Sequence, residues 1–202
     1  MHKYYLVYKP YGVLNQFRDE LGRPTLASLY NFPKDVYPVG RLDIDSEGLL
    51  LLTNDKSINH RLLNPKFRHE KTYWVQVEGD ITDEAIEKLK KGVTIKVDGK
   101  LHHTLPAKVF RFVDEPNLPE RNPPIRFRKN IPTSWVSLCI VEGKKHQIRK
   151  MTAAVGFPTL RLVRSQIQGL GLENMQVGEV RELSAQEVYE KLFGEKQTEQ
   201  AK

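Results

Sequence analysis

Asp43, Asp45 and the Ser46 hydroxyl lie between glycines, directly ahead of four leucines, in Gly40-Arg41-Leu42-Asp43-Ile44-Asp45-Ser46-Glu47-Gly48-Leu49-Leu50-Leu51-Leu52-Thr53-Asn54. Four leucines are too few to span a membrane, but they match the length of a buried strand. Such a strand would hold the preceding loop, and with it Asp43, rigidly against the core. The alternative is that Asp43, Asp45 and Ser46 are ordinary turn residues that bond their own backbone.

The chain has 202 residues, of which 39% are hydrophobic and 28% charged. This length allows one domain, or two lobes that share a cleft. No apolar stretch approaches the roughly 18 residues of a membrane helix, and the start MHKYYLVYKPYG lacks the features of a secretory signal. We therefore expect a globular, cytoplasmic protein. The single cysteine, Cys139, excludes an internal disulfide, and the six histidines show no metal-ligand spacing.

The net charge of +7 is distributed unevenly along the chain. Between residues 121 and 164 there are ten basic side chains and one acid, Glu142, so this segment carries +9 and the remainder −2. Six of the ten are arginines, which favour phosphate forks and base stacking. A basic block on an otherwise slightly acidic protein indicates a polyanionic partner, with nucleic acid first and an anionic membrane surface second.

The apolar periodicity predicts strands mixed with short helices. The expected strands are 4–8, 13–17, 49–52, 71–77, 93–97, 107–113, 134–141, 160–167 and 179–183; the expected helices are 25–30, 55–63, 83–91, 145–155 and 187–193. Strands 4–8 and 13–17 would form an early hairpin. Residues 114–132 hold five prolines and four basic side chains, so we expect a long functional loop. Without a regular βαβ rhythm, the pattern favours an α+β protein on a large, mainly antiparallel sheet with peripheral helices.

Three segments in series resemble one family. They are Gly40 to Leu50, then Lys71-Thr72-Tyr73-Trp74-Val75, then Glu142-Gly143-Lys144-Lys145-His146-Gln147-Ile148-Arg149-Lys150-Met151. In order and spacing, they resemble the pseudouridine synthases of the ribosomal-RNA branch, and the match runs over about residues 5–183.

The resemblance implies the pseudouridine synthase fold, with two lobes around a central basic cleft. It implies that the protein isomerises a uridine in ribosomal RNA, expected to be large-subunit RNA, with no cofactor and no metal. It places a single catalytic domain at residues 1–193, without a separate N-terminal RNA-binding domain. We expect residues 194–202 to be a disordered tail and the protein to be a monomer.

The resemblance also implies roles for individual residues. Asp43 matches the aspartate that attacks either the sugar or the base, and Arg149 matches the arginine that pairs with it. Tyr73 matches the tyrosine that stacks on the target base, although it would also suit a core aromatic. The expected RNA-binding residues are Arg41, Arg126, Arg128, Lys144, Lys145, His146, Gln147, Lys150, Arg161, Leu162 and Arg164. Leu162 would pack beside the target base, and it is equally suited to a core.

Two other functions compete with this interpretation. A glycoside hydrolase also needs two carboxylates, but Asp43 and Asp45, two residues apart in one loop, rarely face each other at the ~5–9 Å which that mechanism requires. A non-catalytic RNA-binding or ribosome-assembly protein would use only the basic block. That second reading leaves Asp43 and Tyr73 without a purpose.

Overall fold

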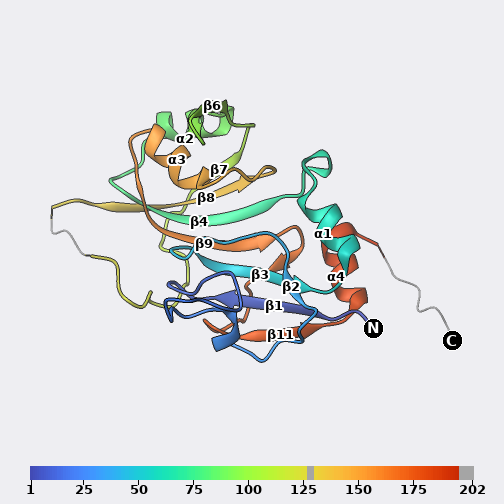
Figure 1. Cartoon of the computed structure of the whole chain (residues 1–202). Helices are drawn as coiled ribbons and strands as arrows, with labels where there is room; N and C mark the ends of the chain where they lie inside the picture. Colours follow the sequence, from blue (N-terminus) through green and yellow to red (C-terminus); the bar gives the residue numbers. More distant parts are fainter. Residues whose placement is uncertain (127–129, 196–202) are drawn as a thin grey trace. The chain divides into compact units, whose positions relative to one another are not determined.

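The computed structural model describes residues 1–126 and 130–195, and the chain forms two compact units. Unit 1 comprises Met1–His69 and Ser165–Lys202, and unit 2 comprises Glu70–Arg164 (Figure 1). The elements of unit 1 are β1 (Tyr4–Lys9), η1 (Leu26–Ser28, a 3-10 helix), β2 (Tyr37–Pro38), β3 (Glu47–Thr53), α1 (Lys56–Leu63), η2 (Pro65–Phe67), β10 (Leu170–Gly171), β11 (Val180–Leu183) and α4 (Ala185–Phe193). Those of unit 2 are β4 (Lys71–Glu78), α2 (Asp83–Lys91), β5 (Thr94–Val97), β6 (Lys100–His103), β7 (Lys108–Arg111), β8 (Thr133–Ile140) and α3 (Gln147–Ala154). Strand β9 (Thr159–Ile167) begins in unit 2 and ends in unit 1.

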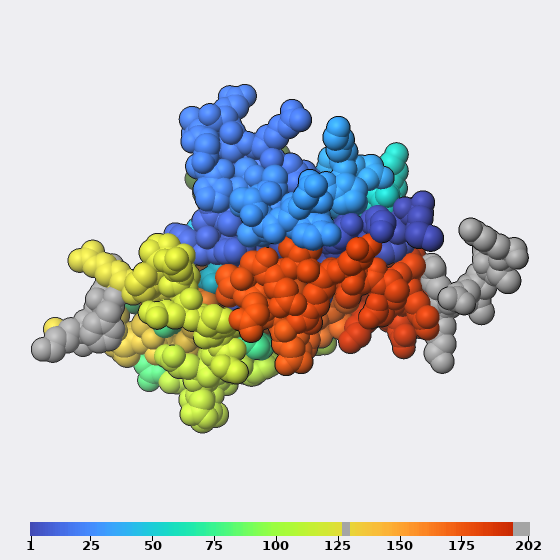
Figure 2. Space-filling model, turned by 90° about the horizontal axis from the view of Figure 1, so that it is seen from below, coloured from blue at the N-terminus to red at the C-terminus, as the bar shows by residue number. Residues whose placement is uncertain are grey.

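Strand β3 lies at the centre of unit 1. Leu49, Leu50, Leu51 and Leu52 are all 0% exposed, so the four leucines form the buried strand that the sequence predicts. Strand β1 pairs antiparallel with β3 on one side and with β11 on the other. The C-terminal part of the unit, orange to red in Figure 2, therefore lies against the blue N-terminal part.

The predicted hairpin of residues 4–8 and 13–17 is wrong. The first strand forms, but the second segment makes only an isolated bridge between Leu14 and Thr25. After β1, the buried ammonium of Lys9 donates to the carbonyls of Pro10 at 2.9 Å and Val13 at 2.8 Å. These bonds turn the chain away from β1, whose two edges are taken by β3 and β11.

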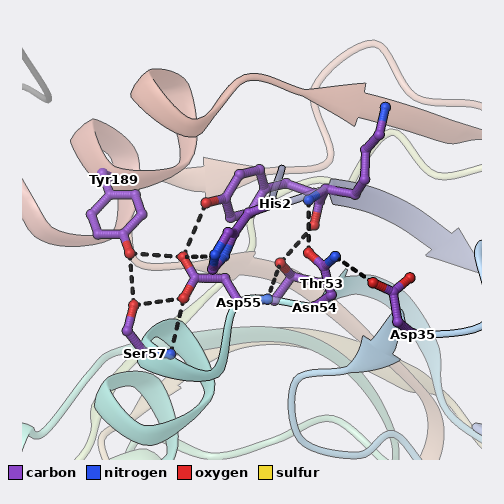
Figure 3. A network of polar contacts seen from close by, with 9 residues as sticks. His2, Asp35, Thr53, Asn54, Asp55, Ser57 and Tyr189 are labelled. Atoms are coloured by element: carbon purple, nitrogen blue, oxygen red, sulfur yellow. Dashed lines mark hydrogen bonds and ion pairs between the residues drawn. The ribbon is translucent and has the colours of Figure 1, made fainter. Parts of the chain in front are cut away.

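A polar network around Asp55 joins three elements of unit 1 (Figure 3). The buried carboxylate of Asp55 caps α1 by accepting a hydrogen bond from Ser57 N at 2.9 Å. It also accepts hydrogen bonds from the hydroxyls of Tyr4 at 3.0 Å and Tyr189 at 2.8 Å. Burial alone would raise the pKa of Asp55, but the hydrogen bonds from Ser57, Tyr189 and Tyr4 outweigh it and hold that pKa below its ordinary value. The network ties β1 and α4 to the start of α1, and in Figure 1 α1 and α4 lie side by side.

Unit 2 is built on strands β4, β8 and β7, which pair antiparallel in that order. Helices α2 and α3 lie on one face of these strands (Figure 1), and the apolar core lies on that side. The predicted helix 83–91 is confirmed as α2, and Thr82 caps it by accepting from Ala85 N at 3.2 Å. The apolar side chains of α2 join the core together with those of the strands.

Strand β6 has no counterpart in the sequence prediction. It pairs with β5 through a two-residue turn in which both Asp98 and Gly99 have positive φ, the geometry of a tight hairpin. Its sequence, Lys-Leu-His-His, is mostly exposed and does not alternate between apolar and polar residues, which is why periodicity does not reveal it.

The α+β class and the mainly antiparallel pairing of the strands are confirmed by the described residues. No helix in the described ranges is long and apolar enough to cross a membrane. The expected loop at 114–132 is irregular where it is described, and residues 127–129 lie outside the description. The same holds for residues 196–202, on which most of the expected tail falls.

Candidate active site

Asp43, the predicted nucleophile, lies half-buried in the loop between β2 and β3 of unit 1. The loop closes on itself, because Ser46 N donates to the Asp43 carbonyl at 3.0 Å. The turn after β1 also holds it, through a bond of 2.8 Å from Gly12 N to the Ile44 carbonyl. Leu42 anchors the other side of Asp43 in the core. These contacts, together with the buried strand that follows, fix the backbone that carries the carboxylate.

Both ends of this loop need glycine. Gly40 has φ +77° and Gly48 φ +108°, in the left-handed region where a Cβ is strained. At Gly40 a Cβ would also approach Cδ2 of Leu63 to 3.1 Å. Ser46 is 1% exposed, and its Oγ meets no hydrogen-bond partner in the part of the chain that the structure describes. The backbone of Ser46, and not its hydroxyl, therefore closes the turn, and Arg41 at the loop's start is exposed.

Tyr73 lies in β4 of unit 2, opposite Leu138 of β8. It is half-buried and packs against the apolar core from the side of the sheet that α2 and α3 cover. The strand alternates as the sequence predicts, with Val75 and Val77 fully buried on the same side. Tyr73 is thus part of the core edge and still reaches solvent, as a ring that stacks on a base must.

Helix α3 begins at Gln147, two residues later than predicted. His146 precedes it with φ 55°, in the left-handed region, so the chain turns sharply before the helix starts. Lys144, Lys145 and His146 are exposed in this turn and do not lie on the helix. Arg149 and Lys150 follow in the first helical turn, and both are half-buried.

A hydrogen-bond network holds the turn before α3. The side chain of Gln147 is buried, where its Oε1 accepts from Lys144 N at 2.9 Å and its Nε2 donates to Glu142 Oε1 at 2.8 Å. Glu142 Oε1 also accepts from Leu105 N at 2.7 Å, and its Oε2 lies 3.0 Å from Nε2 of His102 on β6. The Gln147 amide, expected to bind RNA, is therefore used within the protein, and binding RNA directly would require breaking this network.

The predicted RNA-binding residues of β9 are also buried. Leu162 belongs to the apolar core of unit 2, so its core interpretation is the one the structure shows. Arg161 is 6% exposed, and its Nη2 donates to the carbonyl of Pro119 at 2.9 Å, which fastens the proline-rich loop to the strand. Arg164 is 3% exposed. Arg126 is exposed in the proline-rich loop, and Arg128 lies outside the described residues.

Two residues that the sequence reasoning did not assign carry charge into unit 2. Glu142 holds the turn before α3 through its hydrogen bonds. The sequence feature that could have identified it is that it is the only acid among the ten basic residues of 121–164. Lys71 begins β4, and burial, followed by the nearby Arg164 guanidinium, lowers the pKa of its ammonium group. A half-buried lysine beside a buried arginine raises the local positive potential.

The whole net charge of the protein lies in unit 2. Glu70–Arg164 contains 18 basic and 11 acidic residues, a net charge of +7, while the remaining 14 basic and 14 acidic residues of unit 1 cancel. This places the attraction for a polyanion on the unit that also carries Tyr73 and Arg149. Across residues 1–126 and 130–195, no three His, Cys, Asp or Glu side chains are grouped as a metal site.

Comparisons with known proteins identify the family. The model of the RNA pseudouridylate synthase family matches residues 3–154. The ribosomal large subunit pseudouridine synthase E of Vibrio parahaemolyticus is 53% identical over 175 residues, covering 87% of this chain and 71% of the relative. That of Xanthomonas campestris is 49% identical and covers 87% of this chain and 92% of the relative.

A solved structure described as a pseudouridylate synthase superposes with a TM-score of 0.76 at 30% identity, covering 95% of this chain and 74% of that one. The matched residues 3–154 include the Asp43 loop, the β4 segment and the start of α3, which carried the resemblance in the sequence. The chain belongs to the RNA pseudouridylate synthase family.

Proposed function

We propose that this protein isomerises a uridine of large-subunit ribosomal RNA to pseudouridine. The observation that carries the proposal is the anchored loop of Asp43, which holds a carboxylate at a fixed position just ahead of a wholly buried strand. The names of the relatives from Vibrio and Xanthomonas support ribosomal RNA as the substrate.

In the proposed reaction the uracil N1–C1′ bond breaks and a C5–C1′ bond forms. The hydrogen on C5 leaves as a proton and N1 gains one, so substrate and product are isomers. Asp43 attacks the sugar or the base of a nucleotide turned out of the RNA, and covalent capture splits one difficult step into two. Tyr73 stacks on the flipped base, and Arg149, which matches the arginine of the family motif, provides the positive charge that the reaction needs.

The surface charge of unit 2 supports the choice of RNA as partner. Lys144, Lys145 and His146 are exposed beside the start of α3, and Arg126 is exposed in the proline-rich loop. Cations in such positions neutralise phosphates and orient the RNA without reading its sequence. The exact uridine would then be chosen by RNA shape and flanking contacts.

Release of tritium from RNA labelled at uridine C5 tests the activity directly. Wild-type protein should release tritium from a large-subunit transcript, whereas Asp43→Asn should fall below about a tenth of that rate and bind the RNA within a few fold. Asp45→Asn, in the same loop, is the matched control. A non-catalytic RNA-binding protein would bind the transcript without releasing tritium, and that result would overturn the proposal.

Mapping pseudouridine in ribosomal RNA from cells with and without the protein identifies the position modified. The monomeric state and the cytoplasmic location stay predictions. Light scattering of the purified protein checks the first, and fractionation of cells checks the second.

A further inference from the structure

Three aromatic side chains form a cluster on unit 2: Trp74 of β4, Phe110 of β7 and Phe112, which follows β7. Trp74 and Phe110 both lie opposite Ser137 of β8, so the small serine separates two large rings. Phe112 extends the pairing by one row, since its N–H donates to the Trp135 carbonyl at 2.9 Å. The ring centroids of Trp74 and Phe112 are 5.8 Å apart, and those of Phe110 and Phe112 are 5.6 Å apart.

This cluster lies on the face of the strands away from the core. Side chains alternate along a strand, and Tyr73, Val75 and Val109 pack on the core side with α2 and α3. Trp74 and Phe110 must therefore point to the opposite face. A nucleotide that stacks on Trp74 is not the one that stacks on Tyr73, so the cluster is separate from the proposed catalytic residues of this unit.

The cluster is open to solvent. Phe110 is 57% exposed, and Trp74 and Phe112 are half-buried. A contiguous group of partly exposed rings on a sheet marks a binding surface more often than a single exposed apolar residue does.

The groups around the rings favour nucleic acid. Lys108 lies on the same face, two residues before Phe110 in β7, with its ammonium in an ion pair with Glu70. Next to Trp74 along β4, the Gln76 amide and the Thr133 hydroxyl, 3.1 Å apart, provide groups that hydrogen-bond to bases and 2′-hydroxyls.

The proline-rich loop is attached to this face. In β9, which follows β4 in the strand order, Leu162 joins the core, so Arg161 points to the same face as Trp74 and binds Pro119 there. The loop is thus attached at Pro119 to the face that carries the rings. With the +7 charge of the unit, the surface combines aromatic rings, hydroxyl and amide groups and cations, the composition that single-stranded RNA requires.

We propose that Trp74, Phe110 and Phe112 form a second RNA-binding surface, on which unpaired nucleotides outside the modified one stack. This inference rests on the proposed function in taking RNA as the partner. Stacking accepts any base, so the surface adds affinity and orientation for the RNA without selecting its sequence.

Phe110 is the residue to change, because it is the most exposed of the three rings and its loss should leave the fold intact. Phe110→Ala and Phe110→Leu should each weaken binding of an oligouridine by about 5- to 100-fold, the range for loss of one base–aromatic stack. Phe110→Tyr should bind as wild type does. Leu101→Ala, which removes a 78% exposed apolar side chain from β6 in the same unit, is the matched control and should change nothing.

Two further measurements distinguish stacking from other effects. Oligouridine should quench the fluorescence of Trp74, and Trp74→Phe should remove that part of the quenching. The slope of log affinity against log salt should not change in Phe110→Ala, because stacking releases no counterions. Circular dichroism verifies that each variant is folded.

Tritium release separates this inference from the proposed function. At saturating RNA, Phe110→Ala should keep the wild-type rate while its KM for a long transcript rises. If the wild-type protein binds oligouridine through Phe110 but releases no tritium, the proposed function is wrong and the second RNA-binding surface is still supported. Unchanged oligouridine affinity in Phe110→Ala, or full affinity in Phe110→Leu, would overturn the inference and indicate a surface for an apolar protein partner.

Discussion

Arg149 and Lys150 are neighbours in the first turn of α3, both half-buried and both cationic. They differ in the role that the family resemblance assigns, since Arg149 is the proposed partner of the reacting carboxylate and Lys150 a phosphate contact. Removing the partner of a carboxylate in a partly dry site costs more than removing one phosphate contact.

Arg149→Met should therefore slow tritium release at saturating RNA by at least about ten times more than Lys150→Met does. Both variants should lose a similar factor in RNA affinity, since each removes one cation. Single-turnover rates and binding curves for the pair provide the test. Equal losses in rate would mean that Arg149 is one more phosphate contact.

Asp55 is a second residue whose charge has a defined task. Its carboxylate receives hydrogen bonds from Ser57, Tyr189 and Tyr4, which hold its pKa below the ordinary value of 3.8. A depressed pKa contributes stability above the ordinary pKa of the unfolded chain, and this contribution is lost as the pH falls through the folded pKa.

Asp55→Asn should lower the free energy of unfolding at pH 7 by about 1–3 kcal/mol, because an amide accepts fewer of these bonds and weakens the helix cap. The difference from wild type should shrink as the pH is lowered below about 4. Urea unfolding at a series of pH values measures both effects. Asp35→Asn, an exposed aspartate that accepts from Asn54 Nδ2 at 2.7 Å, is the control and should show neither.

At the scale of elements, the start of α3 depends on β6 and on the segment that follows it. Glu142 joins them, through Leu105 N and His102 on one side and Gln147 on the other. The helix carries Arg149 two residues later, in its first turn, so a shift of its first residue changes where the guanidinium points. Glu142 and Gln147 are positioning residues, because they act through the helix and not on the RNA.

Glu142→Gln should lower the rate at saturating RNA by about tenfold and leave KM within a few fold, since misplacing a reacting group costs rate before it costs binding. A purely structural role would instead lower stability and leave the rate of the folded protein unchanged. Glu87→Gln makes the same chemical change on exposed α2, where Glu87 pairs with Lys90, and should alter neither.

At the scale of the whole molecule, the distribution of charge determines how the protein meets RNA. Unit 2 carries all of the net charge, but Arg161 and Arg164 are buried and therefore unsuited to phosphate contacts. Among the residues that the structure describes, four of the predicted RNA-binding cations of unit 2 are at least partly exposed: Arg126, Lys144, Lys145 and Lys150.

Four phosphate contacts predict a slope of log affinity against log salt of about −3, at ~0.7–0.9 per contact. Arg126→Gln should reduce the slope by about one unit and weaken all RNA sequences alike. Lys88→Gln on α2, where Lys88 pairs with Glu84, should leave the slope unchanged. If Arg126→Gln has the same salt slope as the wild type, the RNA binds away from the proline-rich loop.

Local sequence predicted the elements whose signals are local. The four leucines predict the strand β3 without reference to its neighbours in the fold. Helix α2 is predicted by the cap residue Thr82 and by the helical spacing of Ala85, Ile86 and Leu89. The family was visible for the same reason, because its three motifs are short segments whose order survives in the sequence. Asp43 could be named from its loop alone.

Tertiary structure decided what each side chain faces. The chain turns after Lys9, and β1 pairs with β3 and β11, which are distant in sequence. At His146 the backbone is left-handed, and α3 starts later than the sequence predicts. Gln147 and Arg161, polar in the sequence and expected at the RNA, proved to be buried and bonded within the protein. Composition and periodicity specify which residues suit a strand, a helix or a charged surface, but burial and hydrogen bonding depend on partners that only the folded chain brings together.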